Sequence, residues 1–348
     1  MARAVGLGID LGGTKILAGV VDLESGAVLA TAKKKTRAER GPDELLDRLG
    51  DVAEEALAEA ALPPDVALRG AGVAAAGQVD PARGVLIAAP NLGGDLDLPI
   101  AAALGERLGV PVALGNDVQV AALGERHFGA GRGVDRLLCV FVGTGIGGAL
   151  LRDGELDRGV TATAGEIGHT TIDAGGRHCG CGGRGHLEAY ASRTAITRVL
   201  LDELRRGRPS LLTKLLKDEG LDDEAQDAAA IRSGMLAKAV AAEDELTLET
   251  LREAAHYLGL GLASAINFYN PRRIVLGGGV VEAVPLLLDI ARQVALREAL
   301  PVPGAAVEIV PTQLGDDAGI IGAALLGGRA APVERAGRDG HGKRHKHH

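Results

Sequence analysis

Aromatic residues are scarce in this sequence, and tryptophan is absent. They make up 2% of the 348 residues, so alanine, valine and leucine must fill the core. So few aromatic rings argue against a surface that stacks the bases of single-stranded nucleic acid. The net charge of −8 also argues against nucleic-acid binding, except at a local basic patch. We therefore expect small molecules rather than nucleic acids as partners.

Long apolar runs and a disulfide framework are missing as well. No apolar run is long enough to cross a membrane, and because a strand pattern starts at Ala4 we expect no signal peptide. The three cysteines, Cys139, Cys179 and Cys181, are too few and odd in number for a disulfide framework. We therefore expect a cytoplasmic protein that has no contact with a membrane.

Positive charge is concentrated in two short stretches. Residues 33–35 are lysines in a predicted edge strand, where they discourage association between sheets. Residues 343–348 are rich in Lys, Arg and His, and they end a segment, residues 329–348, that we expect to be disordered. This tail is open to three interpretations: a metal-binding tail, a segment added for expression, or a tail without function.

The sequence does contain a regular alternation of strand and helix patterns. Apolar stretches bounded by glycine turns predict strands, and stretches led by acidic residues with apolar residues at helical spacing predict helices. In the first part of the chain we expect strands at 4–10, 16–23, 27–35, 67–74 and 111–115, helices at 42–60, 98–108 and 117–127, and a loop at 76–95.

The opening pattern returns later in the chain. A strand at 137–142, a glycine turn at 143–148 and a returning strand from 149 repeat the first strand–turn–strand unit, which indicates a duplicated architecture. After them we expect mostly helix at 187–269 with a charged surface insertion at 202–228, a strand at 273–276, a helix at 281–299, a strand at 306–310 and a helix at 317–327.

Strands mixed with helices in this way predict α/β layers in two domains. A cleft between two domains is the usual place for a small-molecule site. We expect a small α/β domain of residues 1–116 plus 316–328, and a large α/β domain of residues 117–315.

A glycine-rich turn follows the first predicted strand and has the sequence Asp10-Leu11-Gly12-Gly13-Thr14-Lys15. Glycine lets backbone N–H groups approach a phosphate, Thr14 adds a hydroxyl donor, and Asp10 can hold Mg²⁺ through water. The spacing is not that of a P-loop, and a plain hairpin turn would also explain it. Further glycine turns at 143–148 and 277–279 favour a nucleotide cleft, because such loops can surround a phosphate chain.

Asn116 and Asp117 lie where a predicted strand ends and a predicted helix begins. The N-terminus of the helix favours the ionised carboxylate of Asp117, which could take the proton of a sugar hydroxyl as its oxygen attacks phosphorus. Helix capping by either residue explains the same pattern. The two roles are compatible.

Four side chains of the segment 166–188, two imidazoles and two thiols, make up a ligand set that suits tetrahedral Zn²⁺. The four residues are His169, Cys179, Cys181 and His186. Glycines between them let the chain fold around an ion, whereas Cys139 lies inside an apolar strand and is interpreted as a core residue. No ligand position is left for a catalytic water. We therefore expect structural zinc that shapes the loop carrying Glu166 and Glu188.

In their order and spacing, these motifs resemble those of the ROK (repressor, open reading frame, kinase) family of sugar kinases, and most of all its bacterial ATP-dependent glucokinases. The resemblance covers nearly all of residues 4–328. Besides the turns and the metal segment, it rests on Asn91-Leu92-Gly93-Gly94 and Gly115-Asn116-Asp117. It implies the actin-like/hexokinase-type ATPase fold, with two α/β domains that close on the sugar.

The resemblance also implies a role for each site residue. Asp117 would be the general base in the transfer of the γ-phosphoryl group of ATP to glucose, which gives glucose 6-phosphate. The sugar would be held by Asn91, Asn116, Asp117, Glu166, His169 and Glu188, and His169 would also bind zinc. ATP with Mg²⁺ would be held by Asp10, Gly12, Gly13, Thr14, Lys15, Thr144, Gly145 and Gly278. The family is usually dimeric or tetrameric, so a homodimer or homotetramer is expected.

One ligand departs from the family pattern, which has a third cysteine where His186 stands. Because histidine also binds zinc, we expect a site of two cysteines and two histidines. Other functions stay open: a kinase for N-acetylmannosamine, fructose or allose, a sugar-sensing protein without catalysis, or a transcriptional repressor. Because the phosphate turn starts at residue 8, we expect no DNA-binding domain of the kind found in such repressors. ATP, ADP and polyphosphate all stay open as the phosphoryl donor.

Overall fold

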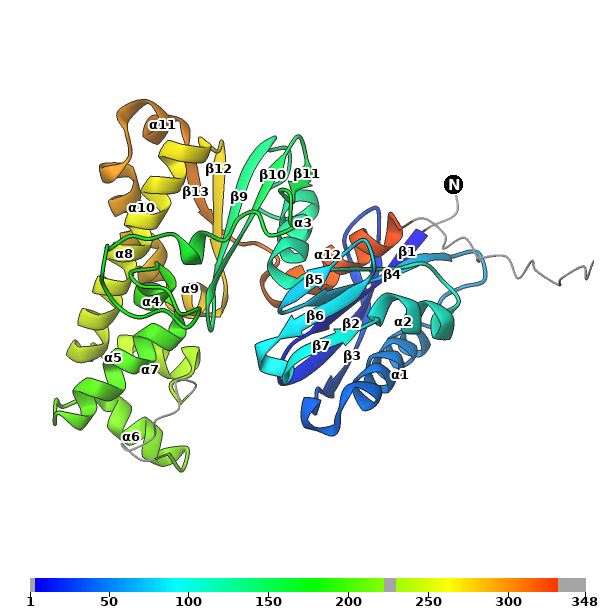
Figure 1. Cartoon of the computed structure of the whole chain (residues 1–348), viewed down its shortest axis with the longest axis horizontal. Coiled ribbons are helices and arrows are strands. Elements are labelled where there is room, and N and C mark those ends of the chain that lie inside the picture. The colour runs from blue at the N-terminus through cyan, green and yellow to red at the C-terminus, as the bar shows by residue number, and fades with distance from the viewer. Residues whose placement is uncertain (1–3, 222–229, 331–348) are drawn as a thin grey trace, which may run out of the picture.

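Two lobes, each built on a five-stranded sheet, make up the computed structural model of the chain (Figure 1). The structure describes residues 4–221 and 230–330. The strand order is β3-β2-β1-β4-β8 in the first sheet and β11-β10-β9-β12-β13 in the second. In each sheet the first three strands pair antiparallel and the last two join in parallel. The two sheets therefore share one topology, and the predicted duplication is confirmed.

The strands of the first sheet are β1 (Ala4–Leu11), β2 (Lys15–Asp22), β3 (Val28–Lys35), β4 (Ala67–Ala75) and β8 (Val112–Asn116). Those of the second are β9 (Arg136–Val142), β10 (Ile146–Arg152), β11 (Glu155–Asp157), β12 (Arg273–Gly277) and β13 (Glu308–Pro311). The helices are α1 (Pro42–Ala60), α2 (Ile100–Leu108), α3 (Asp117–Phe128), α4 (Glu188–Ala191), α5 (Arg193–Arg205), α6 (Leu211–Asp218), α7 (Ser233–Ala241), α8 (Glu245–Tyr269), α9 (Gly279–Ala283), α10 (Pro285–Glu298), α11 (Pro301–Ala306) and α12 (Ala318–Gly328).

Each lobe has its own core of aliphatic side chains. In the first lobe, α1 buries Leu45 and Leu49 against the sheet. In the second lobe, α8 runs beside α10 and buries Leu258 and Leu262. With 25 residues α8 is the longest helix described, yet neither it nor any other helix of the described residues is long and apolar enough to span a membrane. The expected core of Ala, Val and Leu is therefore confirmed, with isoleucine added.

The helices α3 and α12 connect the lobes. α3 follows β8 and contacts both sheets, β4 and β8 in the first and β9 and β10 in the second, whereas α12 follows β13 of the second sheet but packs on β1 and β4 of the first. The two helices also pack on each other through glycines. A Cβ on Gly124 would lie 2.8 Å from the carbonyl oxygen of Ala318, and one on Gly322 would overlap the carbonyl of Val120. This close packing sets how the lobes meet at the carboxyl ends of the sheets.

The expectation of a loop at 76–95 is wrong. Three short antiparallel strands, β5 (Gln78–Asp80), β6 (Val85–Ala89) and β7 (Gly94–Leu98), form a small third sheet there. Gly84 and Gly93 both have positive φ angles, 65° and 109°, and they supply the tight turns. Turn-forming residues are so frequent in this segment that the short apolar runs between them could not be recognised as strands from the sequence. Val85 and Leu86 are nevertheless buried.

Other boundaries differ less. β10 begins at Ile146 rather than 149, and the helix expected at 281–299 is divided into α9 and α10 at Pro285. In the expected surface insertion at 202–228, α6 buries Leu212 and Leu216 in the core, so this part is not a surface insertion. Its residues 222–229 lie outside the described residues, as does the expected disordered tail from residue 331 onward. The lysines at 33–35 do lie on an edge strand, β3, as expected.

Candidate active site

The turn between β1 and β2 carries the first pair of glycines. The backbone N–H of Gly12 donates to the carbonyl of Lys15 at 3.1 Å, and the buried Thr36 hydroxyl donates to the carbonyl of Gly12 at 2.6 Å. A Cβ on Gly13 would lie 2.9 Å from the Cβ of Asn91, so only glycine fits there without a shift. The turn is therefore held in one shape, with Asn91 beside it.

The corresponding turn between β9 and β10 is held in place by the first residues of helices α4 and α5. The guanidinium of Arg193 donates to the Thr144 hydroxyl at 2.7 Å. A side chain at Gly145 would overlap the carboxylate of Glu188, which accepts a hydrogen bond from the backbone N–H of Ile146 at 2.9 Å. The second turn thus depends on residues that come more than forty positions later in the chain.

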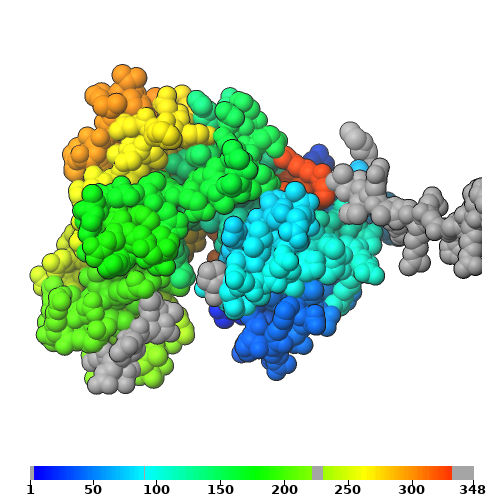
Figure 2. Space-filling view, viewed as in Figure 1, coloured from blue at the N-terminus to red at the C-terminus, as the bar shows by residue number. Residues whose placement is uncertain are grey.

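A cavity of about 330 Å³ lies between the lobes, at the carboxyl ends of the strands. Asp10 pairs with Ala74 of β4, which pairs in turn with Gly115 of β8, so these parallel strands end at one edge and bring Asp117 to it. The lining includes Asp10, Asp117, Phe141, Gly278, Glu282, Asp316 and Gly319. Because Phe141 and Gly278 belong to the second lobe, the cavity is an interdomain cleft, and a hollow between the lobes is visible in Figure 2.

Acidic side chains dominate the electrostatics of this cavity. Burial, and then the charge of Asp117, raises the pKa of Asp10 from 3.8 to about 6, while Lys15 opposes the rise and Asp316 adds to it. Burial also raises the pKa of Asp117, against hydrogen bonds from the backbone N–H groups of Asp117 and Val118 that lower it. Several carboxylates beside one lysine suit a divalent cation with oxygen ligands, as Mg²⁺ prefers.

A smaller cavity of about 210 Å³ is lined by Asn116 and Glu166, together with Gly77, Gln78, Val79, Gln119, Ala162 and Thr163. Asn116 caps α3, because its side-chain oxygen accepts hydrogen bonds from the N–H groups of Val118 and Gln119 at 3.1 and 3.2 Å. Its amide nitrogen donates to the carbonyl of Gly77 at 3.2 Å. The capping interpretation of Asn116 is therefore confirmed, and the same residue borders a polar cavity.

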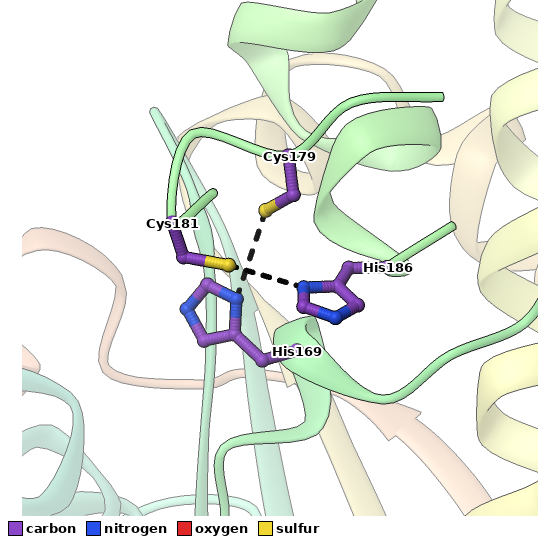
Figure 3. A group of neighbouring side chains, drawn as sticks. All are labelled: His169, Cys179, Cys181 and His186. Atoms are coloured by element: carbon purple, nitrogen blue, oxygen red, sulfur yellow. Dashed lines mark hydrogen bonds between the residues drawn. The ribbon is translucent and has the colours of Figure 1, made fainter. Parts of the chain in front are cut away.

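The four expected metal ligands point toward a common centre (Figure 3). They are His169, Cys179, Cys181 and His186, and their ligand atoms all lie within 4.8 Å of one another. The Cys181 Sγ is 3.2 Å from the Nδ1 of His186, and the Cys179 Sγ is 3.8 Å from the Nδ1 of His169. Gly182 has a positive φ of 92°, which turns the chain between the second cysteine and His186. Two sulfurs and two nitrogens at these separations fit tetrahedral zinc.

The structure brings most of the expected site residues into three groups. Asp10, Asp117 and Gly278 line the larger cavity, Asn116 and Glu166 line the smaller one, and His169, Cys179, Cys181 and His186 form the metal cluster. Thr14, Lys15 and Thr144 are exposed on the two glycine turns. Asn91, His169 and Glu188, expected to contact the sugar, do not line the smaller cavity in this structure.

Four residues that support the site were missed in the sequence. They are Thr36, Gln119, Arg193 and Asp316. Gln119 could have been found, because it follows Asn116 by three positions on a helix and so shares its face. Thr36 and Arg193 gave no local signal, because each acts on a glycine turn that is distant in the chain.

Comparison with known proteins decides the family. The profile of the ROK family matches residues 6–329, which is nearly the whole chain. The chain belongs to the ROK family. Its structure accordingly has the actin-like ATPase fold of ROK hexokinases and glucokinases, so the expected family and fold class are confirmed.

The ROK relatives include enzymes and regulators. The chain is 32% identical to a glucokinase of Thermotoga maritima over 320 residues, which are 92% of this chain and 96% of the relative. It is similar to the ROK glucokinase of Streptomyces griseus, solved in complex with glucose and AMPPNP, with 32% identity, a TM-score of 0.75 and coverage of 93% and 99%. It is also 29% identical to the xylose repressor of Bacillus subtilis, over 91% of this chain and 75% of the repressor.

Proposed function

We propose that this ROK protein is an ATP-dependent hexose kinase that transfers the γ-phosphoryl group of ATP to glucose and forms glucose 6-phosphate. One observation carries the proposal: the consecutive residues Asn116 and Asp117 line two different cavities. The end of one strand, β8, therefore lies between the proposed acceptor site and the proposed donor site. The similarity to glucokinases supports glucose as the acceptor and ATP as the donor.

In the proposed reaction Asp117 is the general base. Its carboxylate takes the proton of the 6-hydroxyl group, and the oxygen forms a bond to the γ-phosphorus. The bond between that phosphorus and the bridging oxygen of ADP breaks, so that ADP leaves with the electron pair. The burial that raises the pKa of Asp117 supports this role, because a carboxylate with a higher pKa is a stronger base.

We assign the donor site to the two glycine turns and the larger cavity. The turn residues Gly12, Gly13, Thr14, Lys15, Thr144 and Gly145 would hold the phosphates of ATP. Gly278 would lie near the adenosine, since it lines the larger cavity. Asp10 would hold Mg²⁺ through water, and the bound cation would neutralise phosphate charge.

We assign the acceptor site to the smaller cavity and its surroundings, with sugar contacts from Asn91, Asn116, Asp117, Glu166, His169 and Glu188. Asn116 and Glu166 already line that cavity. Asn91 lies beside the first glycine turn, His169 belongs to the metal cluster, and Glu188 lies next to that cluster. The lobes would therefore have to close on the sugar for all six residues to contact it.

We propose structural zinc at the metal cluster, held by His169, Cys179, Cys181 and His186. Four protein ligands complete a tetrahedral site and leave no position for a reacting water. The ion would fix segment 166–188, which carries Glu166 and Glu188. Because the ligands include two thiolates and the donor is ATP, we also propose a reducing, ATP-containing compartment, the cytoplasm.

We propose that the protein is a homodimer, or a homotetramer built from such dimers, and that the contact is the α8 surface. This surface consists of Phe268 and an apolar groove of about 420 Å³ that α8 forms with β9, β10 and residues 165–170. Phe268 is 95% exposed, which is unusual for so large an apolar side chain. Because Phe268 itself borders the groove, a two-fold rotation would set the phenyl ring of each copy against the groove of the other.

The domain division also remains a proposal: residues 1–116 with 316–328 as the small domain and 117–315 as the large one. It is supported by the contacts of the connecting helices. α12, which starts at Ala318, packs on the first sheet, and this supports residues 316–328 as part of the small domain, whereas α3, which starts at Asp117, contacts both sheets.

A coupled kinase assay tests the proposed function. Glucose, N-acetylmannosamine, fructose and allose are each combined with ATP, ADP or polyphosphate, and we expect the highest kcat/KM for glucose with ATP. Asp117→Asn should lower kcat by about 10²- to 10⁴-fold, the usual contribution of a general base, while calorimetry still detects glucose binding. If Asp117→Asn turned over at the parent rate, the base would be another residue. Sugar binding without turnover in the parent chain would favour a sensor.

A further inference from the structure

Gln119 is a buried polar residue for which the proposed reaction has no role. It lies in the first turn of α3, two positions after Asp117, and is 5% exposed. Its side-chain nitrogen donates a hydrogen bond to the carbonyl of Ala162 at 2.9 Å. Its side-chain oxygen is buried and accepts no hydrogen bond from the described residues. A half-satisfied buried amide costs stability, so its presence calls for an explanation other than stability.

The partner of Gln119 belongs to a strained loop. Residues 158–166 connect β11 to the 3-10 helix that carries His169, and Glu166 stands at the end of this loop. Ala162 has a φ of 61°, a conformation that residues with a side chain rarely adopt and that persists only where the surroundings hold it. Among the described residues, Gln119 donates the one hydrogen bond that reaches positions 161–163 from outside the loop.

The bond also lies at the acceptor cavity. Gln119 and Ala162 both line it, as do Asn116 on the side of α3 and Glu166 on the side of the loop. The helix that begins with Asp117 is therefore joined directly to the loop that ends with Glu166. We propose that Gln119 is a positioning residue that holds loop 158–166 over the acceptor cavity, and so fixes Glu166 relative to Asp117 for binding of a hexose.

This inference rests on the proposed function for its kinetic consequence alone. Losing one hydrogen bond that fixes a sugar-binding loop should raise the KM for the hexose by about 3- to 10-fold. The KM for ATP should stay within about twofold, because the donor cavity does not include Gln119. A substitution of Gln119 should therefore change the KM for the hexose but not the KM for ATP.

Gln119→Met separates positioning from a merely structural role. Methionine is close in size and has no amide, so it removes the bond to Ala162 together with the unpartnered oxygen. We expect an unchanged or slightly higher melting temperature, and faster hydrogen exchange of peptides from 158–166, measured by mass spectrometry without sugar or nucleotide. Gln78→Met is the matched control, since Gln78 lines the same cavity but makes no hydrogen bond to the loop, and its loop exchange should equal that of the parent.

The outcomes distinguish this inference from the proposed function. Faster loop exchange in Gln119→Met but not in Gln78→Met, with a rise in hexose KM alone, supports the positioning role. Unchanged loop exchange, or equal rises in the KM for hexose and ATP, overturns it. If Gln119→Met melts early, Gln119→Asn replaces it, because asparagine keeps the amide but is one methylene too short to reach Ala162. If the parent phosphorylates no sugar, the proposed function fails while the exchange measurement still tests the contact.

Discussion

Glu188 and Ile146 are joined by a hydrogen bond of 2.9 Å, from the backbone N–H of Ile146 to the Glu188 carboxylate. The other carboxylate oxygen of Glu188 lies 3.7 Å from the Sγ of Cys179. One side chain thus touches both the second glycine turn and the metal cluster. Since a side chain at position 145 would overlap the same carboxylate, the turn and the cluster are positioned together.

This relationship predicts that zinc removal affects more than the metal loop. Cys181→Ser should lose bound zinc, because serine is a poor replacement for a thiolate ligand. Cys179 and then Glu188 should lose their fixed positions, so we expect a lower melting temperature and a higher KM for the hexose. Zinc content, measured by atomic emission on chelator-washed protein, should fall from about one per chain to near zero.

Two variants control this experiment. Cys139→Ala removes a buried thiol of β9 that is outside the cluster, and it should keep its zinc. His186→Cys restores the ligand type that the family pattern favours, and it should keep zinc as well. The zinc assignment would be wrong if washed parent protein contained no zinc, or if Cys181→Ser bound as much as the parent.

Asp10 should make stability depend on pH. Its pKa rises from 3.8 to about 6 on folding, so the folded protein favours the protonated form. The stability that protonation contributes is complete below about pH 4 and is lost as the pH rises through about 6. At neutral pH the ionised carboxylate therefore costs stability, by at most about 3 kcal/mol, and partial exposure reduces this value.

Asp10→Asn should consequently be more stable than the parent at about pH 7 and equal to it near pH 4. Urea denaturation over a pH series, without Mg²⁺ or ATP, measures the difference. The variant should also lose most of its Mg²⁺-dependent activity, since the amide is a weaker ligand for a hard cation. Asp65→Asn, in an exposed loop, is the control and should follow the parent at every pH. A constant difference from pH 4 to 8 would contradict the prediction.

Local patterns were sufficient for much of the fold. Helix α1 has the bounds expected from the sequence, because Pro42 favours the first helical position and acidic residues follow it. The metal cluster was also predictable, because all four ligands lie in one short, glycine-rich segment and their chemistry follows from residue type. Asp10 and Asp117 could be named because Asp10 lies at the end of a recognisable buried strand, and Asp117 directly follows another.

The rest depends on contacts between distant segments. The three strands β5–β7 were missed because each is too short for a periodic pattern and depends on its neighbours for pairing. The bond between Gln119 and Ala162 spans 43 positions, and no local pattern encodes it. The packing of α3 on α12 depends on Gly124 and Gly322, which in the sequence are two glycines among 52.

If the α8 surface is the contact between two copies, a substitution of Phe268 should lower the mass of the protein measured in solution. Phe268→Ser should convert the dimer to a monomer, because each copy loses the apolar ring proposed to fill its partner's groove. Sedimentation velocity or light scattering after size exclusion should show half the parent mass. Leu29→Ser is the control, since Leu29 is also an exposed apolar residue but lies on β3 of the other lobe. A monomeric parent, or an unchanged mass for Phe268→Ser, would exclude this interface.

Replacement of glycine by alanine should have opposite effects on stability at Gly105 in α2 and at Gly322, where α12 packs on α3. At Gly105 in α2, an added Cβ meets only an ordinary contact of 3.6 Å, so Gly105→Ala should stabilise the protein by up to about 1 kcal/mol through helix propensity.

At Gly322 the same methyl group would overlap the backbone carbonyl of Val120, which cannot move without shifting α3. Overpacking of this kind costs about 1–3 kcal/mol or more, which exceeds the gain in propensity. Gly322→Ala should therefore lower the denaturation midpoint while Gly105→Ala raises it. Because α3 begins with Asp117, the shift should also reduce kcat, and a stable, fully active Gly322→Ala would show that the two helices can separate without cost to the site.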